Sequence, residues 1–237
     1  MQRNSRFGVL EGVLTFPLRI LLVFLFIMTI LEKEGGAETY TVTELGTFPD
    51  GSYSFAYGIN DADQVVGYGD GQIGAYSSNF AFVWDAVGGM RYLGGVSSSA
   101  AYDINNSGQV VGTAQVTIGG DSHAFVWDAV GGMRDIGTFG GFSIAYGIND
   151  LGQVVGESES NNLDLPHAFI WDAVNGMRDI GTLPGMTYSI AYGINNQGQV
   201  VGESGARTIG GFFIAYAFLW DPINGMQNLG SLIPGGF

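Results

Sequence analysis

The chain contains no cysteine among its 237 residues and only two histidines. A disulfide framework and the commonest zinc sites, which use cysteine, are therefore excluded. Basic residues are also scarce: 8 Lys and Arg stand against 22 Asp and Glu, for a net charge of −14. A surface of this sign repels nucleic acid and anionic lipid and favours cations or basic partners. We expect no nucleic-acid partner.

The chain also lacks an apolar run long enough to span a bilayer comfortably. An apolar run of 12 residues, 20–31, follows three arginines and precedes the small residues 35–37, which is the order of a secretory signal peptide. We predict residues 1–37 to be a signal peptide cleaved after Ala37, with a retained signal anchor as the alternative. The remaining repeat domain, residues 38–237, is then expected to be secreted or held at the cell surface, with no membrane segment after cleavage.

No segment after residue 37 carries a convincing helical period. Instead, one pattern of four short pieces recurs four times. The pieces are Ser-x-Ala-Tyr-x-Ile-Asn, then Gly-Gln-Val-Val-Gly (Asp-Gln-Val-Val-Gly in the first copy), then Ala-Phe-x-Trp-Asp, then a piece of the type Met-Arg-Asp-Ile-Gly-Thr. The tryptophans of the third piece are 43, 44 and 49 residues apart. This is the length of one four-stranded unit rather than of a whole domain.

The pieces are rich in Val, Ile, Phe, Tyr and Trp and are separated by Gly, Asn and Asp, so we expect strands joined by turns. Four antiparallel strands at this period predict an all-β fold: a β-propeller-like array of about four four-stranded antiparallel blades, possibly incomplete, with a β-solenoid as the alternative. Phe125 and Trp127 should face one side of their strand, and Ala124 and Val126 the other. The repeats span approximately residues 48–94, 95–138, 139–182 and 183–231.

The fourth piece occurs a fifth time, as Thr-Glu-Leu-Gly-Thr-Phe at residues 43–48. We therefore expect an extra leading strand near residues 40–47. Residues 233–237 resemble residues 139–142, which lead into a repeat in the interior, so we expect a shortened member of a longer array. Insertions between the second and third pieces predict variable loops, which are common sites of ligand binding.

Asparagine and aspartate in the first turn of each repeat are weak candidates for binding calcium. The candidates are Asn60, Asp61, Asp63, Asn149 and Asp150. Turn chemistry explains them better, because two or three oxygens fall short of the six to eight that calcium takes. We assign no metal and no cofactor, with Ca²⁺ left open. His123 and His167 hold one position in neighbouring repeats, but no third zinc ligand accompanies them.

Each third piece ends in Trp-Asp. We predict that the tryptophans fill the space between blades and that the aspartates cap the following turn; these structural repeat residues are Trp84, Trp127, Trp171, Trp220, Asp85, Asp128, Asp172 and Asp221. Arg91, Arg134 and Arg178 should pair with the aspartate across the hairpin. Glu157 and Glu203 stand one repeat apart, which favours solvated loop acids over the paired carboxylates of a glycosidase. We expect no catalytic residues and no enzyme.

The order and spacing of Ile-Asn-Asp-x-Gly-Gln-Val-Val-Gly, His-Ala-Phe-x-Trp-Asp and Gly-Gly-Met-Arg-Asp-x-Gly-Thr resemble the HAF family of bacterial extracellular repeat proteins. The His-Ala-Phe triplet stands at residues 123–125 and 167–169, while Phe80 and Tyr216 replace histidine in the outer copies. The resemblance covers nearly all of the chain after residue 37. It implies a secreted protein of uncharacterised activity, with no catalytic or binding residues to carry over.

These observations predict a secreted, non-catalytic repeat scaffold. It would bind a surface polymer, a carbohydrate or a surface protein through its variable loops. One alternative is a propeller-type glycoside hydrolase or lyase. The other is a truncated remnant of a longer repeat protein, because end repeats without caps leave apolar faces exposed.

Overall fold

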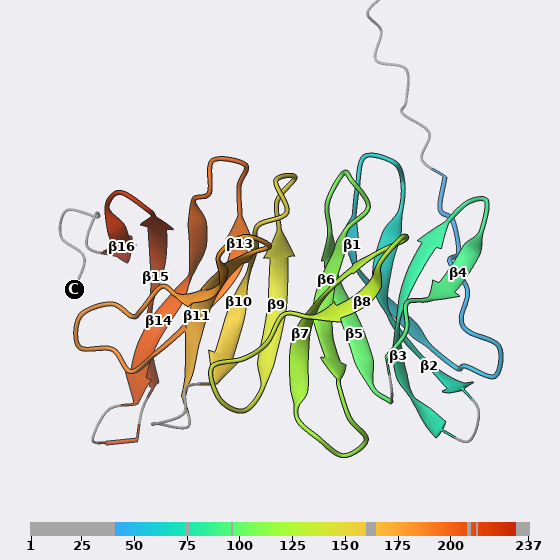
Figure 1. The fold of residues 1–237 in the computed structure, drawn as a ribbon, viewed down its shortest axis with the longest axis horizontal. Coiled ribbons are helices and arrows are strands. Elements are labelled where there is room, and N and C mark those ends of the chain that lie inside the picture. The colour runs from blue at the N-terminus through green and yellow to red at the C-terminus, as the bar shows by residue number, and fades with distance from the viewer. Residues whose placement is uncertain are drawn as a thin grey trace, which may run out of the picture. The chain divides into compact units, whose positions relative to one another are not determined.

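The computed structural model describes residues 41–73, 76–95, 97–159, 165–207, 210–211 and 213–230. The chain divides into two units at Glu44 and Leu45, and the fold described below is that of the second unit. The predicted signal peptide, with its cleavage site at Ala37, lies outside the described residues. Within them, sixteen strands form four four-stranded antiparallel sheets (Figure 1).

Each sheet takes its four strands from one repeat, in chain order. The first sheet comprises β1 (Ser54–Ile59), β2 (Val65–Ile73), β3 (Tyr76–Asp85) and β4 (Gly89–Tyr92), and the second β5 (Ser99–Ile104), β6 (Val110–Gln115), β7 (Ser122–Asp128) and β8 (Gly132–Asp135). The third comprises β9 (Ser143–Ile148), β10 (Val154–Glu159), β11 (Pro166–Asp172) and β12 (Gly176–Asp179), and the fourth β13 (Tyr188–Ile194), β14 (Val200–Arg207), β15 (Phe213–Asp221) and β16 (Gly225–Asn228). The predicted propeller-like blades are confirmed, since a solenoid would build its sheets across repeats.

The turn between the first and second strands of each sheet needs one residue in the left-handed region. Gly108, Gly152 and Gly198 have φ of 78°, 75° and 76° at this position, and Asp63 has φ of 56° in the first repeat. Aspartate tolerates this conformation better than most residues do. This explains why Asp-Gln-Val-Val-Gly can replace Gly-Gln-Val-Val-Gly there.

The first strand of each sheet carries a β-bulge opposite a glycine. In the third sheet, Ala145 pairs with Gly156 and Gly147 with Val155, so Tyr146 is left without a partner across the ladder. A Cβ on Gly156 would lie 1.9 Å from the carbonyl oxygen of Ile144. The other sheets repeat the arrangement, with Gly67, Gly112 and Gly202 in the place of Gly156 and with Tyr57, Tyr102 and Tyr192 skipped. The last glycine of the second piece therefore leaves room for the bulge, and the bulge directs the tyrosine.

The apolar cores lie between the sheets. Phe125 of β7 is buried against the first sheet, whereas Ala124 and Val126 are buried against the third, which confirms the predicted alternation. The first strand of each sheet packs on the preceding sheet: β5 on β1 to β3, β9 on β5 to β7, and β13 on β9 to β11. Three interfaces of one type therefore join the four sheets.

The predicted leading strand near residues 40–47 is wrong for its described part, because residues 41–48 are irregular. Within the described residues no strand precedes this segment to pair with it. Its last residue packs on the first sheet instead: the Phe48 and Phe82 rings meet edge to face with centroids 6.4 Å apart. Ser54 Oγ also donates a hydrogen bond to the carbonyl oxygen of Gly46 at 2.7 Å.

Two of the insertions between second and third strands lengthen hairpins rather than forming long loops. β14 and β15 pair from Val200↔Trp220 out to Arg207↔Phe213, and β2 and β3 pair out to Ile73↔Tyr76. Continuing the ladder satisfies backbone N–H and C=O groups that a loop would leave to water. In the first and fourth repeats, strand residues thus take up much of the stretch where the sequence predicted variable loops, and the connecting residues 74, 75, 208, 209 and 212 lie outside the described residues.

Candidate functional site

The four bulges bring one tyrosine from each sheet into a row, which we call the tyrosine ladder: Tyr57, Tyr102, Tyr146 and Tyr192. The ring centroids of successive members are 5.5, 5.5 and 5.7 Å apart. None of these four tyrosines is among the residues predicted to be functional from the sequence. A signal was present, because tyrosine recurs at one position of the first piece in every repeat.

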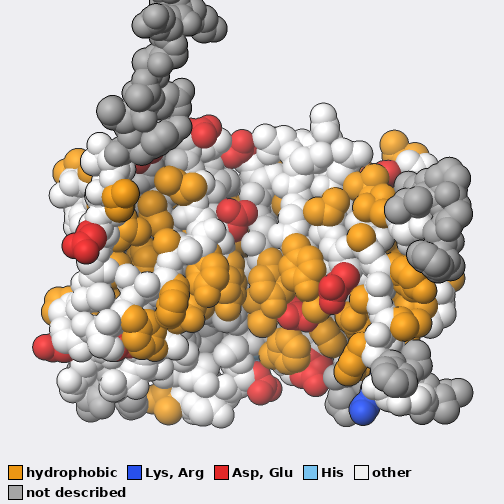
Figure 2. Space-filling model, turned by 180° about the vertical axis from the view of Figure 1, so that it is seen from behind, with side chains coloured by type: hydrophobic (Ala, Val, Ile, Leu, Met, Phe, Trp, Pro, Cys, Tyr) orange, Lys and Arg blue, Asp and Glu red, His pale blue; other side chains and the backbone are white. Residues whose placement is uncertain are grey.

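Further rings extend the tyrosine ladder over the first sheet. Tyr68 stacks on Tyr57 with centroids 5.8 Å apart, and Phe55 lies 5.4 Å from Tyr68. Tyr57 and Tyr192 are 53% and 49% exposed. Figure 2 shows hydrophobic side chains, a group in which tyrosine is included, gathered across one face of the molecule. Acidic side chains lie between them. The protein thus presents rows of half-exposed aromatic rings to solvent.

A buried carboxyl group supports the centre of the tyrosine ladder. Tyr146 Oη donates a hydrogen bond to Glu157 Oε1 at 2.7 Å, and Glu157 is only 7% exposed. Burial raises the pKa of Glu157; the hydrogen bond from Tyr146 opposes this shift, and the Glu203 carboxylate adds to it. Burial also raises the pKa of the Tyr146 hydroxyl. The prediction that Glu157 is a solvated loop acid is wrong, because Glu157 lies within β10 and faces inward.

We expect Glu157→Gln to stabilise the protein near neutral pH, by an amount that shrinks on acidification. The folded-state pKa of Glu157 is raised, so its ionisation costs stability as the pH rises above the unfolded pKa of about 4.3. Glutamine keeps an oxygen that can accept from Tyr146. Urea unfolding of both proteins at about pH 4 and about pH 7 measures the difference. A stability difference that does not change with pH would contradict the prediction.

An acid whose pKa is lowered in the folded state, rather than raised, provides the control for this pH dependence. Hydrogen bonds from the Asn224 side chain and then from turn N–H groups hold the pKa of Asp221 below its usual value. Its contribution to stability is therefore present above the unfolded pKa and lost as the pH falls. Asp221→Asn should destabilise the protein more at neutral pH than at acid pH.

A second polar cluster joins the turns between the first and second strands, and we call it the asparagine ladder: Asn60, Asn105, Asn149 and Asn195. Asn105 Oδ1 accepts from the N–H groups of Ser107 and Gln109, closing its own turn. Asn105 Nδ2 donates to the carbonyl oxygen of Asn149 in the next sheet at 3.0 Å. Asn60 donates to Asn105 and Asn149 to Asn195 in the same way, at 3.1 and 2.9 Å.

The residues that follow form a parallel row of hydrogen bonds. The N–H of Asp61 donates to Asn106 Oδ1, that of Asn106 to Asp150 Oδ1, and that of Asp150 to Asn196 Oδ1, at 3.0, 2.9 and 2.9 Å. The bond from the Asn106 N–H is the main cause that lowers the pKa of Asp150. The four turns together line an open depression of about 360 Å³.

Four of the five calcium candidates lie in this depression, while Asp63 does not line it; the four are Asn60, Asp61, Asn149 and Asp150. Asn60 Oδ1 and Asn149 Oδ1 each accept two N–H groups of their own turn. A cation bound through these two oxygens would compete with those hydrogen bonds. In the described part of the chain, no group of three or more His, Asp or Glu side chains is placed to hold a metal ion.

The Trp-Asp residues occupy structural positions. Asp85 Oδ1 accepts from the N–H groups of Val87 and Gly88, and Oδ2 accepts from Arg91 at 2.5 Å. The Gly88 bond and then the Arg91 bond lower the pKa of Asp85. The next two repeats have the same turn cap and the same ion pair, with Arg134 3.0 Å from Asp128 and Arg178 3.3 Å from Asp172. In the fourth repeat, Asp221 caps its turn without an arginine. Trp127, Trp171 and Trp220 pack, partly buried, against the three cores between sheets.

The two histidines each face an aspartate of their own sheet rather than each other. His123 Nδ1 lies 2.9 Å from Asp135 Oδ2, and His167 Nδ1 lies 2.8 Å from Asp179 Oδ2. Each pair spans the third and fourth strands of one hairpin. The geometry is that of a local hydrogen bond within a repeat.

The fold and its exposed rings define a class: an all-β repeat protein of propeller-like blades with an aromatic row built on the first strands. Residues 25–132 match a family described as "Protein of unknown function (DUF3466)". No curated protein matches the chain. Among the described residues there is no helix with the length and apolarity that crossing a membrane requires.

Proposed function

We propose that the protein is a secreted, non-catalytic scaffold that binds a neutral carbohydrate polymer along the tyrosine ladder. The carrying observation is the row itself: one partly or half-exposed ring from each sheet, at centroid spacings of 5.5 to 5.7 Å. A tyrosine ring offers a flat apolar face to the C–H groups of a sugar and a hydroxyl for hydrogen bonding. A regular row suits a ligand that itself repeats.

The charge of the protein supports a neutral ligand. The chain carries a net charge of −14. The negative charges of Glu157 and Glu203 contribute to the raised pKa values of Tyr146 and Tyr192 in the ladder. An anionic polymer would be repelled by this surface. The Glu203 carboxylate, which is partly exposed, and the tyrosine hydroxyl oxygens can accept hydrogen bonds from sugar hydroxyl groups.

The proposed surface differs from the one that the sequence predicted. It lies on the first strand of each sheet, not on variable loops. Glu157 is buried under Tyr146 and hydrogen-bonded to it, which supports a role in holding the ring rather than in acid catalysis. Export through residues 1–37 and the resemblance to the HAF family are sequence predictions that agree with this proposal.

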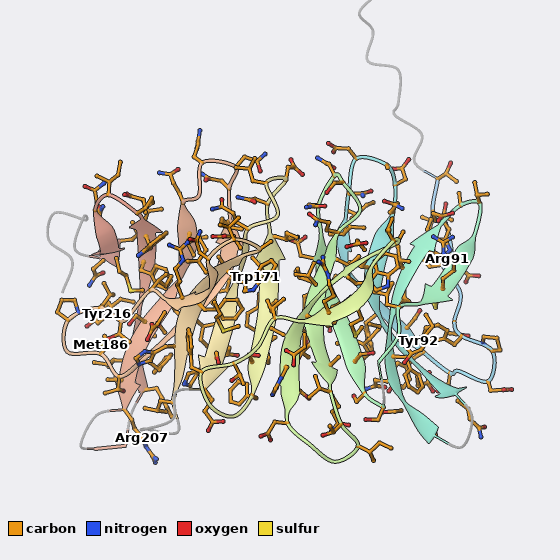
Figure 3. The ribbon with its side chains drawn as sticks, viewed as in Figure 1. Arg91, Tyr92, Trp171, Met186, Arg207 and Tyr216 are labelled. Carbon is orange, nitrogen blue, oxygen red and sulfur yellow. The ribbon has the colours of Figure 1, made fainter. Side chains whose placement is uncertain are left out.

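Binding of cellohexaose, followed by calorimetry, tests the proposal. Tyr57→Ala and Tyr192→Ala should each weaken binding by about 2- to 10-fold, since one aromatic contact is worth roughly 0.5–1.5 kcal/mol. Tyr216→Ala is the matched control: Tyr216, labelled in Figure 3, is a similarly exposed tyrosine on β15, a strand that contributes no tyrosine to the ladder. Dextran sulfate is the anionic comparison and should not bind.

Three results would overturn parts of the proposal. Equal binding by the ladder variants and by Tyr216→Ala would place the carbohydrate elsewhere. Failure of cellohexaose and of other neutral glucans to bind would remove carbohydrate as the ligand class. Shortening of cellohexaose during incubation would instead support the alternative of a glycoside hydrolase.

A further inference from the structure

The three interfaces between sheets all use the same two surfaces. We call the side of a sheet that meets the next sheet its forward face, and the opposite side its rear face. In the interface between the second and third sheets, Val111 and Ala124 of the forward face pack with Ala145, Ile148 and Phe169 of the rear face. These five side chains are all buried. The repeated pieces thus encode both halves of one contact in every sheet.

Among the described residues, none covers the forward face of the fourth sheet. Val201 takes the repeat position of Val155, and it is 46% exposed where Val155 is 0% exposed. Ala217 is exposed where the equivalent Ala168 is buried. Phe213, on the same side of β15 by strand alternation, is exposed as well. This sheet carries a forward face of the same apolar composition as the three buried ones.

The rear face of the first sheet is exposed along its first strand, β1. Ile59 takes the position of Ile148 and is 65% exposed, where Ile148 is 7% exposed. Ala56 is exposed where the equivalent Ala145 is buried. The first and fourth sheets of one chain therefore do not cover each other. One exposed forward face and one exposed rear face are thus present, the two surfaces that form the interface found three times inside the chain.

The asparagine ladder ends in complementary groups at the same two places. Within the described residues no further turn follows, and Asn195 Nδ2 donates to the side chain of Gln197 instead. Its other hydrogen bond, to Gln199, has a counterpart in each of the other three turns. In the first turn, the Asn60 carbonyl and the Asp61 side chain take positions that receive hydrogen bonds from a preceding turn in the later repeats. The fourth turn thus offers donors and the first turn offers acceptors.

We infer that two copies of this chain join head to tail, with the forward face of the fourth sheet of one copy on the rear face of the first sheet of the other. Asn195 Nδ2 then donates to the Asn60 carbonyl of the second copy, and the Asn196 N–H to its Asp61 side chain. Because the two faces differ, the contact is heterologous, and copies add until a ring closes or a filament grows. Each join places Tyr192 beside Tyr57 of the next copy, which lengthens the tyrosine ladder.

One position is duplicated in such a join. Leu45, ahead of the first sheet, corresponds to Ile136 and Ile180 of the interior, and Leu229 at the end of the fourth sheet corresponds to the same residues. Only one of the two can lie between the joined sheets. The contact between copies therefore depends on β1, β14 and the turns that follow the first strands, where Ile59 and Val201 are exposed. It also requires one of the two end segments to move aside.

Paired charge substitutions on the full chain test this inference. Sedimentation of the natural protein over a range of concentrations should show reversible association. Val201→Glu and Ile59→Glu each place a charge in one face, and each should weaken self-association by about 10-fold or more. An equal mixture of the two variants retains one intact face of each kind and should form one-to-one pairs that grow no further. Both positions are exposed, so the fold should tolerate the changes, and circular dichroism checks it.

The absence of cysteine in the natural chain allows a second readout. Ile59→Cys mixed with Val201→Cys should form a disulfide dimer under mild oxidation, because the corresponding pair in the interior, Ile148 and Val111, shares one cluster. Val87→Cys, at a fully exposed turn position, replaces either member as the control. The inference is overturned if the natural chain stays monomeric, if the mixture of glutamate variants does not pair, or if Val87→Cys cross-links as readily.

Discussion

Gly156→Ala will destabilise the protein by about 3 kcal/mol, at the upper end of the cost of overpacking a close-packed site. The added Cβ would lie 1.9 Å from the Ile144 carbonyl oxygen and 2.9 Å from the Ala145 Cα. Both obstacles are backbone atoms, so no side chain can rotate away. Relief requires the bulge in β9 to open, which also moves Tyr146 out of the tyrosine ladder.

Thermal unfolding measures this effect, and a melting point lower by roughly 6–12 °C is expected for a loss of this size in a chain of this length. Gly131→Ala is the control, because the nearest atoms to its Cβ are 3.4 Å away and belong to the Asp128 side chain. It should change stability by no more than about 0.5 kcal/mol. Equal melting points for the two variants would show that the bulge does not depend on glycine.

Asn105→Asp will cost about 2–4 kcal/mol at neutral pH, the cost of leaving buried polar groups unpaired or repelled. Asn105 is buried, and its Nδ2 donates to the Asn149 carbonyl and to Gln109 Oε1. A carboxylate has no hydrogen to donate, so an oxygen would face the Asn149 carbonyl oxygen. Protonation restores a donor, so the loss should shrink as the pH falls.

The fourth member of the asparagine ladder provides the control for this change. Asn195 has the same turn hydrogen bonds, but its Nδ2 donates to two glutamine side chains and the residue is exposed. At a concentration where the chain is monomeric, Asn195→Asp should cost less than about 1 kcal/mol. Chemical denaturation of both variants measures the difference, and a cost for Asn195→Asp as large as that for Asn105→Asp would contradict the link between sheets.

The strands and sheets could be predicted from the sequence because each depends on neighbouring residues. Alternation in residues 124–127, with small and large side chains on opposite faces, predicted which side chains would meet which sheet, and the structure agrees. The structure of residues 43–48 was harder to predict. Residues 43–48 repeat the pattern of a strand, yet a strand forms only where a partner strand offers its backbone.

The aromatic row was not predicted, although its tyrosines are visible as a repeated letter. Their meeting depends on a register shift that skips Tyr146 and its equivalents, and register belongs to the pairing of two strands rather than to either sequence alone. Glu157 was misjudged for a related reason. Its position after a repeated valine pair looked like the start of a loop, but β10 continues through it and turns its side chain inward.

The sequence alone determined the repeat, the four hairpin units, the acidic surface and the turn residues, since these follow from composition and local backbone preferences. The tertiary structure decided the rest: which faces pair, how Asn105 ties one sheet to the next, and where the tyrosines gather. It also decided that, among the described residues, the apolar faces at Val201 and Ile59 are left exposed. The physical reason is that burial and hydrogen bonding between sheets depend on neighbours one repeat away, which no single stretch of sequence contains.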